Sequence, residues 1–392
     1  MANALTLTSF AENIFRARDT VAREAIGFIP GVLMNSDTAA VSINGTVNSL
    51  VTSLPTINTS YTPAMTIPAA DDQTIGNSTT QIDQIANVKI PLRGEDMLKL
   101  SNVGQYQTAI DDMFAQAMRG ISNTIEARIG LVAKNGASRA YGTSGTTPFD
   151  STNKLSFTAQ LDKILTDNGA PAFDRHGVIN TTTKAALLTL TQLTNVNESG
   201  TERSLRRGEL LDVHGFSLKA SAGIATHTAG AMASATTSNA ALTVGQTVLP
   251  LATAGTGVVA AGDVITLAND TNQYVVASVS FAGANPASGD TITIQAPGLR
   301  VAQSAATRAI TVTASYGANI FFQRNAVELI VRPPAKPYGG DAARDVMTVS
   351  DPASGLVYQF SLYMGYGMNM IDVTTFYTAK VWKPEFVATL KS

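Results

Sequence analysis

Two glycine-rich segments have spacings that could bind a nucleotide or activate a serine. Gly255-Thr-Gly257-Val-Val-Ala260 matches a dinucleotide-binding turn, which needs a helix after it and an acidic residue about twenty positions later. Val264-Ile-Thr-Leu follows instead and is strand-like, so we interpret the segment as a turn between strands. Gly142-Thr-Ser144-Gly145 lacks the second glycine of a nucleophile elbow, and we interpret it as a connector.

The histidines and paired carboxylates do not have the spacing of a catalytic or metal site. His176, His214 and His227 form no HExxH-type pair, and the chain has no cysteine, so we interpret them as ordinary surface or turn residues. Asp111 and Asp112 are adjacent on an expected helix, where neighbouring side chains do not face each other. We predict no catalytic residue, no metal, no cofactor and no enzymatic activity.

Two charged clusters are candidates for contacts between subunits. Asp71 and Asp72 lie near the expected tip of a loop, where contact with a basic neighbour and simple solvation are equally favoured. Arg203, Arg206 and Arg207 form the densest basic cluster, which could contact a nucleic acid, an acidic protein or a neighbouring copy of the chain. A solvated loop accounts for these arginines equally well.

The composition favours a folded protein that associates with itself. The chain has 392 residues, of which 44% are hydrophobic and 14% are charged, and its formal net charge is -2. Such a chain can bury a sizeable core but has no long basic run to hold a polyanion, and its low charge favours association. The first residues lack a signal-peptide pattern and no apolar run reaches about 18 residues. We therefore expect cytoplasmic synthesis and no membrane contact.

Three segments of the first half have distinct patterns. Residues 9–26 have the spacing of a short amphipathic helix. Residues 36–92 contain short Thr, Val and Ile stretches broken by Asn and Pro, with no Lys or Arg before Lys89, and this predicts an extended hairpin ordered by neighbouring subunits. Tyr106 to Val132 keeps a 3.6-residue apolar period, which predicts a helix on the order of 40 Å long.

The second half predicts a mixed domain interrupted by a β-rich insertion. Residues 156–168 and 181–193 are expected helices, and 176–180 and 211–220 are expected strands. Residues 224–316 are rich in Ala, Thr, Ser and Gly, and their short apolar runs predict a small all-β module inserted in the host domain. The host resumes near Asn319, and further strands are expected at 356–366, 374–383 and 384–390.

Several short sequences occur along the chain in the order found in one structural family. They are Pro91-Leu92-Arg93-Gly94-Glu95-Asp96-Met97, Arg207-Gly208-Glu209-Leu210 before His214-Gly215-Phe216, Gly262-Asp263-Val264-Ile265, Asn319-Ile320-Phe321-Phe322 before Asn325-Ala326-Val327, and Trp382-Lys383-Pro384-Glu385. With this order of elements, the chain resembles the tailed-bacteriophage major capsid proteins of the Hong Kong 97 fold. It looks closest to the coat protein type of the short-tailed Salmonella phages.

The resemblance implies an α+β fold with named parts. These are an N-terminal arm (1–35), an extended E-loop (36–92), a peripheral domain with a spine helix (93–150), an axial domain in two pieces (151–223 and 317–392, the latter with returning peripheral strands) and an all-β insertion domain (224–316).

The resemblance also implies a function without catalysis. The expected role is a coat protein that forms hexamers and pentamers of an icosahedral head around double-stranded DNA, assembled in the bacterial cytoplasm with a scaffolding protein and a portal. One family member links its subunits through a lysine of the extended loop, but this loop has no lysine before Lys89, so we expect a non-covalent shell. An encapsulin-type nanocompartment shell and a β-rich fibre or adhesin remain as alternatives.

Overall fold

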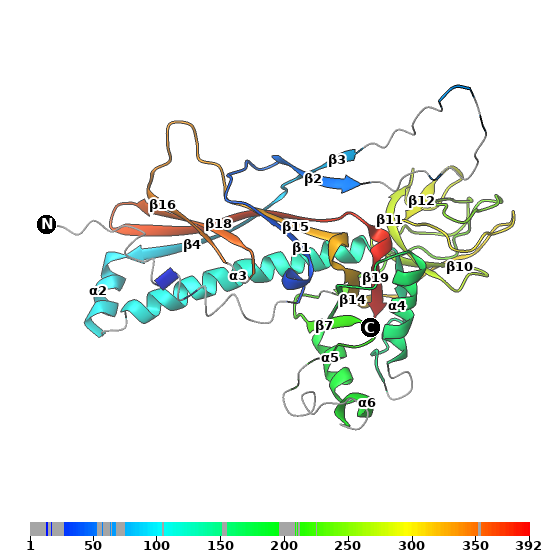
Figure 1. Ribbon diagram of the computed structural model, residues 1–392, viewed down its shortest axis with the longest axis horizontal. Coiled ribbons are helices and arrows are strands. Elements are labelled where there is room, and N and C mark those ends of the chain that lie inside the picture. The colour runs from blue at the N-terminus through cyan, green and yellow to red at the C-terminus, as the bar shows by residue number, and fades with distance from the viewer. Residues whose placement is uncertain are drawn as a thin grey trace.

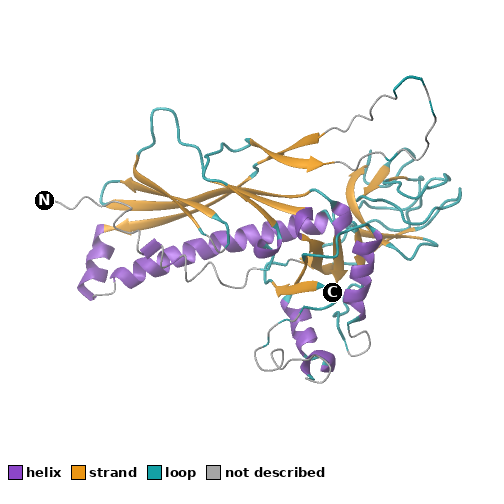
Figure 2. Cartoon of the chain, viewed as in Figure 1, coloured by secondary structure: helices purple, strands orange, loops and turns teal. Residues whose placement is uncertain are grey.

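The computed structural model shows an elongated α+β protein (Figures 1 and 2). It describes residues 13, 14, 17, 27–52, 57, 63, 65–67, 75–103, 106–150, 155–195, 208, 210, 212–224, 226–351 and 354–392. Of the helix expected over 9–26, only Asn13, Ile14 and Ala17 are described, and these three are helical and buried.

The helix α3, Tyr106–Asn135, runs along most of the long axis of the molecule (Figure 1). Its 30 residues span on the order of 45 Å at about 1.5 Å per residue, so the predicted long helix is confirmed. Its buried stripe includes Ile110, Phe114, Ile121, Ile125 and Ile129. The shorter helix α2, Gly94–Val103, precedes it and was not predicted.

A six-stranded sheet lies against α3. Its order is β1 (Leu33–Ser36), β15 (Val327–Arg332), β18 (Met368–Val381), β17 (Val357–Met364) and β16 (Ala343–Ser350), and β4 (Gln84–Arg93) pairs with the other side of β18. Apolar side chains join this long sheet to the helix, and the rings of Phe114 and Phe360 meet edge-on at 5.9 Å. One face of the long sheet therefore belongs to the main core.

Two expectations for the long sheet need correction. The strand expected from 374 already begins at Met368, because a tight turn at Gly365, where the amide donates to the Met368 carbonyl, returns the chain at once. The strand β16 was not predicted, because it is a partly exposed edge strand without strict alternation.

The predicted hairpin is present on the other face of the long sheet. Strands β2 (Thr46–Thr52) and β3 (Ile75–Gln81) pair only with each other and form a separate two-stranded sheet. We call the segment from residue 36 to 83 the hairpin segment. Its described apex, residues 65–67, lies far from β2 and β3 in Figure 1.

The second large sheet has eleven strands. Its path is β13 (Ile310–Val312), β10 (Val264–Leu267), β11 (Gln273–Ser280), β5 (Arg139–Tyr141), β19 (Val387–Lys391), β14 (Tyr316–Gln323), β6 (Arg175–Ile179) and β7 (Phe216–Ala220), with β8 (Thr226–His227), β9 (Val248–Pro250) and β12 (Thr291–Ile294) attached. The helices α4 (Ser156–Asp167), α5 (Thr181–Leu188) and α6 (Thr191–Thr194) accompany it. A second apolar cluster lies between this mixed sheet and α4 and α5.

The structure corrects three expected elements of this region. The helix expected over 181–193 is divided, because Leu190 has extended backbone angles between α5 and α6. The strand expected from 211 begins only at Phe216, because His214 and Gly215 have positive φ angles of 49° and 78° and form a turn. The strand expected at 384–390 is the short helix Pro384–Phe386 followed by β19.

The β-rich segment 224–316 contains the predicted strands but is joined to its host more closely than expected. Strand β11 pairs with β5, and β8 pairs with β14, so hydrogen bonds run continuously from the insertion into the mixed sheet. The segment also has an apolar cluster of its own, which includes Leu251, Ile265 and Ile292. It is therefore both a folded module and an extension of the host sheet.

Candidate assembly surfaces

The charged residues singled out from the sequence could not be placed. Asp71, Asp72, Arg203, Arg206 and Arg207 lie outside the described residues. Their contacts with other subunits remain predictions.

The interpretation of the histidines is correct for one residue and wrong for two. His214 lies in an exposed turn and contacts the Thr158 hydroxyl at 2.6 Å. His176 and His227 are buried, because strands distant in sequence cover them. Burial lowers the pKa of His176, and the nearby Lys219 and Arg324 lower it further, whereas its hydrogen bond with Asp174 acts in the opposite direction.

The two glycine-rich segments are turns, as predicted. Gly255 and Gly257 have positive φ angles, and the strand β10 follows them where a nucleotide-binding turn would need a helix. Ser144 donates its hydroxyl hydrogen bond to the Ala314 carbonyl and lies in an irregular connector between β5 and α4. Neither segment has the surroundings of a nucleotide site or a nucleophile elbow.

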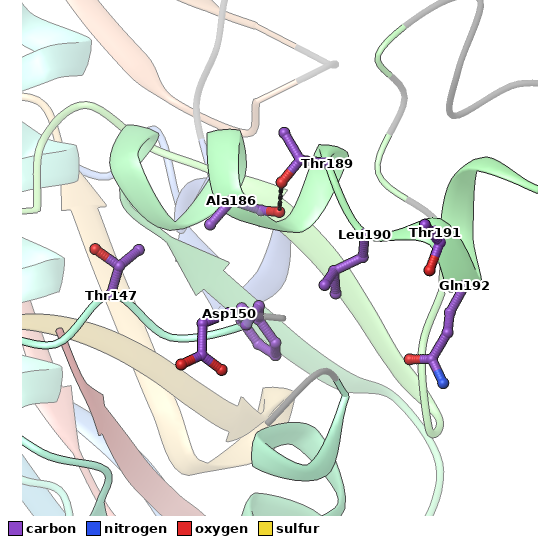
Figure 3. Close-up of a pocket in the computed structure, with 8 residues that line it drawn as sticks. Thr147, Asp150, Ala186, Thr189, Leu190, Thr191 and Gln192 are labelled. Atoms are coloured by element: carbon purple, nitrogen blue, oxygen red, sulfur yellow. Dashed lines mark hydrogen bonds between the residues drawn. The ribbon is translucent and has the colours of Figure 1, made fainter. Parts of the chain in front are cut away.

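A pocket of about 250 Å³ lies between the 147–150 connector and helices α5 and α6 (Figure 3). Its lining is Thr147, Phe149, Asp150, Ala186, Thr189, Leu190, Thr191 and Gln192. The Thr189 hydroxyl donates to the Ala186 carbonyl, within its own helix end. Asp150 is the one ionisable side chain in this lining, so the pocket offers no acid–base pair.

The part of the chain that the structure describes has no candidate metal site and no candidate membrane span. No three His, Asp or Glu residues there gather as metal ligands would. No helix of that part has both the length and the apolarity that crossing a bilayer requires.

The hairpin segment presents large apolar side chains to solvent at its apex. Ile57, Met65 and Ile67 are 81%, 105% and 96% exposed. An apolar side chain normally gains about 1.5–3 kcal/mol on full burial, and this chain does not bury these three. The apex is therefore a candidate contact for another molecule.

A second apolar surface lies at the end of the molecule where α2 meets the β17–β18 turn (Figure 1). We call it the distal surface, and it comprises Leu98, Met364, Tyr366 and Met368, all exposed. Two arginines accompany it: Arg93 pairs with Met368 across β4 and β18, and Arg344 donates to the Met364 sulfur at 2.9 Å. The distal surface thus combines apolar side chains with charges of both signs, because Glu95 and Asp96 lie in the first turn of α2.

A buried polar cluster attaches the root of the hairpin segment to the long sheet. Glu328, on β15, accepts hydrogen bonds from Asn35, Ser49 and Trp382. The sequence gives little indication of this cluster. Glu328 lies between the apolar Val327 and Leu329, and this alternation is typical of a strand residue that faces solvent. The hairpin that covers it comes from far away in the chain.

A second buried carboxylate fixes the chain where it reaches the body of the protein. Glu126, in the middle of α3, accepts hydrogen bonds from the backbone amides of Gly27, Phe28 and Ile29, at 2.6, 2.7 and 3.1 Å. Gly130, one turn later, leaves the space for Phe28, since a Cβ there would lie 3.1 Å from its ring. The 27–29 turn is thereby held against the long helix.

A third cluster joins the insertion to the end of α3. His227 contacts Asp263 through Nε2 and Lys134 through Nδ1, both at 2.8 Å. Burial lowers the pKa of Lys134, and Asp263 opposes this shift. The Lys134 ammonium can donate only to an unprotonated Nδ1, so the contacts fit a neutral imidazole that donates from Nε2 to Asp263.

Comparisons with known proteins give similarities to solved structures only. No family model matches the chain, and no curated protein matches it. A structure from Mycobacterium phage Che8 has 14% identity and a TM-score of 0.45, covering 88% of this chain and 84% of that one. The capsid structure of the cyanophage P-SCSP1u has 12% identity and a TM-score of 0.47, with coverages of 92% and 86%. A virus-like particle from Pyrococcus furiosus has 9% identity and a TM-score of 0.45, with coverages of 97% and 99%.

Proposed function

We propose that this chain is the major capsid protein of a tailed bacteriophage, a coat subunit whose hexamers and pentamers close an icosahedral shell around double-stranded DNA. The observation that carries the proposal is the hairpin segment, whose apex extends away from β2 and β3 (Figure 1) and which exposes Ile57, Met65 and Ile67. A segment that extends outward with unburied apolar side chains is suited to packing on a second copy.

Hydrophobicity gives the hairpin segment a matching surface on the same chain. Residues 36–88 contain four acidic residues, Asp37, Asp71, Asp72 and Asp83, and no basic residue, and Asp83 pairs with Arg128 of its own chain. The distal surface has apolar side chains with Arg93 and Arg344 beside them, and the acidic residues of the first turn of α2 follow Arg93. We propose that the hairpin of one subunit meets the distal surface of another, and this head-to-tail contact builds rings when the rotation between copies closes.

The long helix and the two sheets suit a tile that must hold its shape. The α3 helix packs on the long sheet and reaches the mixed sheet, so it links the two halves rigidly. A fibre or adhesin would not require this helix. Many weak contacts between such tiles add up across a closed shell, each burying a modest apolar area.

The finer parts of the proposal extend the resemblance. We propose that the chain has the parts of the short-tailed Salmonella phage type. These are an arm (1–35), an extended loop (36–92), a peripheral domain (93–150), an axial domain (151–223 with 317–392) and an insertion domain (224–316). A scaffolding protein, a portal and packaged DNA are the proposed partners. Asp71, Asp72, Arg203, Arg206 and Arg207 are proposed to lie at contacts between subunits, and the shell is proposed to need no covalent link.

The test is assembly of the purified protein, seen by negative-stain microscopy and size-exclusion chromatography. We expect the wild type to form shells or tubes of repeating hexamers, and the triple variant Ile57→Ser, Met65→Ser, Ile67→Ser to lose at least tenfold of the particle yield, which corresponds to about 1.4 kcal/mol. Because all three side chains are exposed, the variant subunit should melt at the wild-type temperature.

The matched control is Val244→Ser, an exposed apolar residue of the insertion, which should assemble normally. A wild-type protein that stays monomeric at high concentration would contradict the proposal, as would a triple variant that assembles like the control. Particles from infected cells that enclose protein cargo and no DNA would identify a nanocompartment instead.

A further inference from the structure

One buried carboxylate contributes several contacts at the root of the hairpin segment, beside the backbone bridge of Val41 to Pro334 and the Arg128–Asp83 ion pair. Glu328 is 3% exposed, and its Oε1 accepts from Asn35 Nδ2 at 2.8 Å. Its Oε2 accepts from Ser49 Oγ at 2.7 Å and from Trp382 Nε1 at 2.5 Å. Asn35 belongs to β1, Ser49 to the hairpin strand β2, and Trp382 follows β18. One side chain therefore ties the hairpin to two parts of the body.

A second shell of contacts fixes the donors of Glu328. Arg332 donates to the Asn35 carbonyl and to Asn35 Oδ1, both at 2.7 Å, so the Asn35 amide cannot turn over without losing a charged donor. The Lys380 ammonium lies 4.0 Å from the centre of the Trp382 ring and donates to the Thr79 carbonyl of β3 at 3.4 Å. Both strands of the hairpin are thereby connected to the same cluster.

Polar side chains are buried in the described part of the hairpin strands. Strands β2 and β3 pair only with each other, and Ser49 and Thr80 are buried there, with the apolar Ile82 buried just after β3. Hydrogen bonds are directional, whereas apolar packing tolerates sliding. Polar contacts at the root therefore help to set the direction in which the hairpin leaves the long sheet.

We propose that Glu328 is a positioning residue for assembly, which fixes the direction of the hairpin segment so that its apex meets the next subunit. The effect on assembly rests on the proposed function, whereas the positioning of the hairpin is a property of the single subunit. A small change of angle at the root displaces the apex by a large distance, because the apex lies far from β2 (Figure 1).

The chemistry at this position requires a carboxylate. Asn35 Nδ2 and Trp382 Nε1 can only donate, and they approach opposite oxygens of Glu328. A glutamine would turn its own NH2 group toward one of these two donors in either orientation of its amide. Glu328→Gln thus keeps the size of the side chain but must lose one of the contacts.

The test measures the hairpin directly in the subunit. Because the chain has no cysteine, spin labels can be placed at Asn48→Cys on β2 and Asn123→Cys on α3, both exposed positions. We expect Glu328→Gln to broaden the distance distribution between the labels at least twofold, to speed amide exchange of residues 46–52, and to lower the particle yield severalfold. Glu385→Gln, a half-buried carboxylate elsewhere, is the matched control and should change none of these.

Trp382→Phe is a second variant, which removes one donor and should give a smaller broadening even if Glu328→Gln folds poorly. Equal distance distributions in Glu328→Gln, Trp382→Phe and the control would overturn the inference. If the wild type assembles and Glu328→Gln assembles equally well, the role in assembly is also wrong. If the wild type does not assemble but Glu328→Gln broadens the distribution, the proposed function fails and the positioning role stands.

Discussion

The hairpin segment and the insertion are both long excursions from the same body, but they are attached by opposite means. The hairpin strands form an isolated two-stranded sheet and are anchored by the polar contacts of Glu328. The insertion has its own apolar cluster, and its strands β8 and β11 hydrogen-bond into the mixed sheet. The direction of the hairpin therefore depends on a few contacts at its root, whereas an insertion continuous with a sheet must move with it.

This difference indicates that the hairpin segment and the insertion have different roles within the subunit. The hairpin leaves large apolar side chains of its apex unburied in the subunit. The insertion buries an apolar cluster of its own and adds to the rigid body. Substitutions in the two regions should therefore have opposite consequences for folding and for assembly.

The largest expected effect is on the core of the insertion. Ile265→Ala removes a fully buried side chain on β10, and we expect a loss of about 2–5 kcal/mol in the free energy of unfolding. Chemical denaturation of the isolated subunit, followed by circular dichroism, measures it.

The comparison partner is Ile67→Ala in the hairpin, which should change the free energy of unfolding by less than about 0.5 kcal/mol because Ile67 is exposed. Equal losses of unfolding free energy from Ile265→Ala and Ile67→Ala would remove the distinction between the insertion and the hairpin segment.

A smaller loss of unfolding free energy is expected at the polar cluster that joins the insertion to α3. Burial raises the pKa of Asp263, but hydrogen bonds from His227 and from the amides of Ala260 and Gly230 outweigh burial and hold the pKa below its usual value. The stabilisation is therefore complete above the unfolded pKa of about 3.9 and is lost as the pH falls through the lower folded value.

We expect Asp263→Asn to reduce the free energy of unfolding by about 2 kcal/mol at pH 7 and to flatten its dependence on pH below about 4. Urea denaturation at pH 7, 5 and 3 measures both changes. An unchanged pH dependence in the variant would mean that Asp263 does not couple protonation to the attachment of the insertion. Asp345→Asn, a carboxylate of the edge strand β16, is a control in a different part of the protein.

Elements with their own periodicity were predictable from the sequence. The α3 helix repeats its apolar residues every three or four positions, and the strands β10 and β12 are short apolar runs between turn residues. Such patterns are local, so they are visible without knowledge of the fold. The hairpin was predicted similarly, from a Thr-rich segment that is broken by Asn and Pro and has no basic residue before Lys89.

Contacts between distant segments were not predictable. His227 is flanked by threonines and resembles a surface residue, and only the fold brings Lys134 and Asp263 to its two nitrogens. The pairing of β11 with β5 likewise joins segments more than a hundred residues apart, so the insertion seemed more separate than it is. Burial of Glu328 also depends on a distant segment, because Ser49 lies 279 positions away.

A change of opposite sign in the free energy of unfolding is expected where the insertion returns to the mixed sheet. Lys391 on β19 is buried, and its ammonium contacts the Thr313 hydroxyl at 3.4 Å, just after β13. No carboxylate of the described residues lies within ion-pair distance of it, and burial lowers its pKa to about 8. A lysine with a lowered folded pKa binds its proton more weakly than the unfolded chain does, so stability is lost as the pH falls from about 10.5 to about 8.

Lys391→Met should therefore stabilise the subunit at pH 7 by roughly 1–3 kcal/mol, because it removes the cost of burying an unpaired ammonium group while keeping most of the apolar stem. The gain should shrink at pH 10, where the native lysine has already lost its proton. Melting temperatures of the variant and the wild type at the two pH values measure this difference, and exposed Lys336→Met should shift neither. A gain of equal size at both pH values would show that packing, and not the buried charge, limits the stability of this junction. The attachment of the insertion would then depend on apolar packing, in contrast to the polar contacts at the hairpin root.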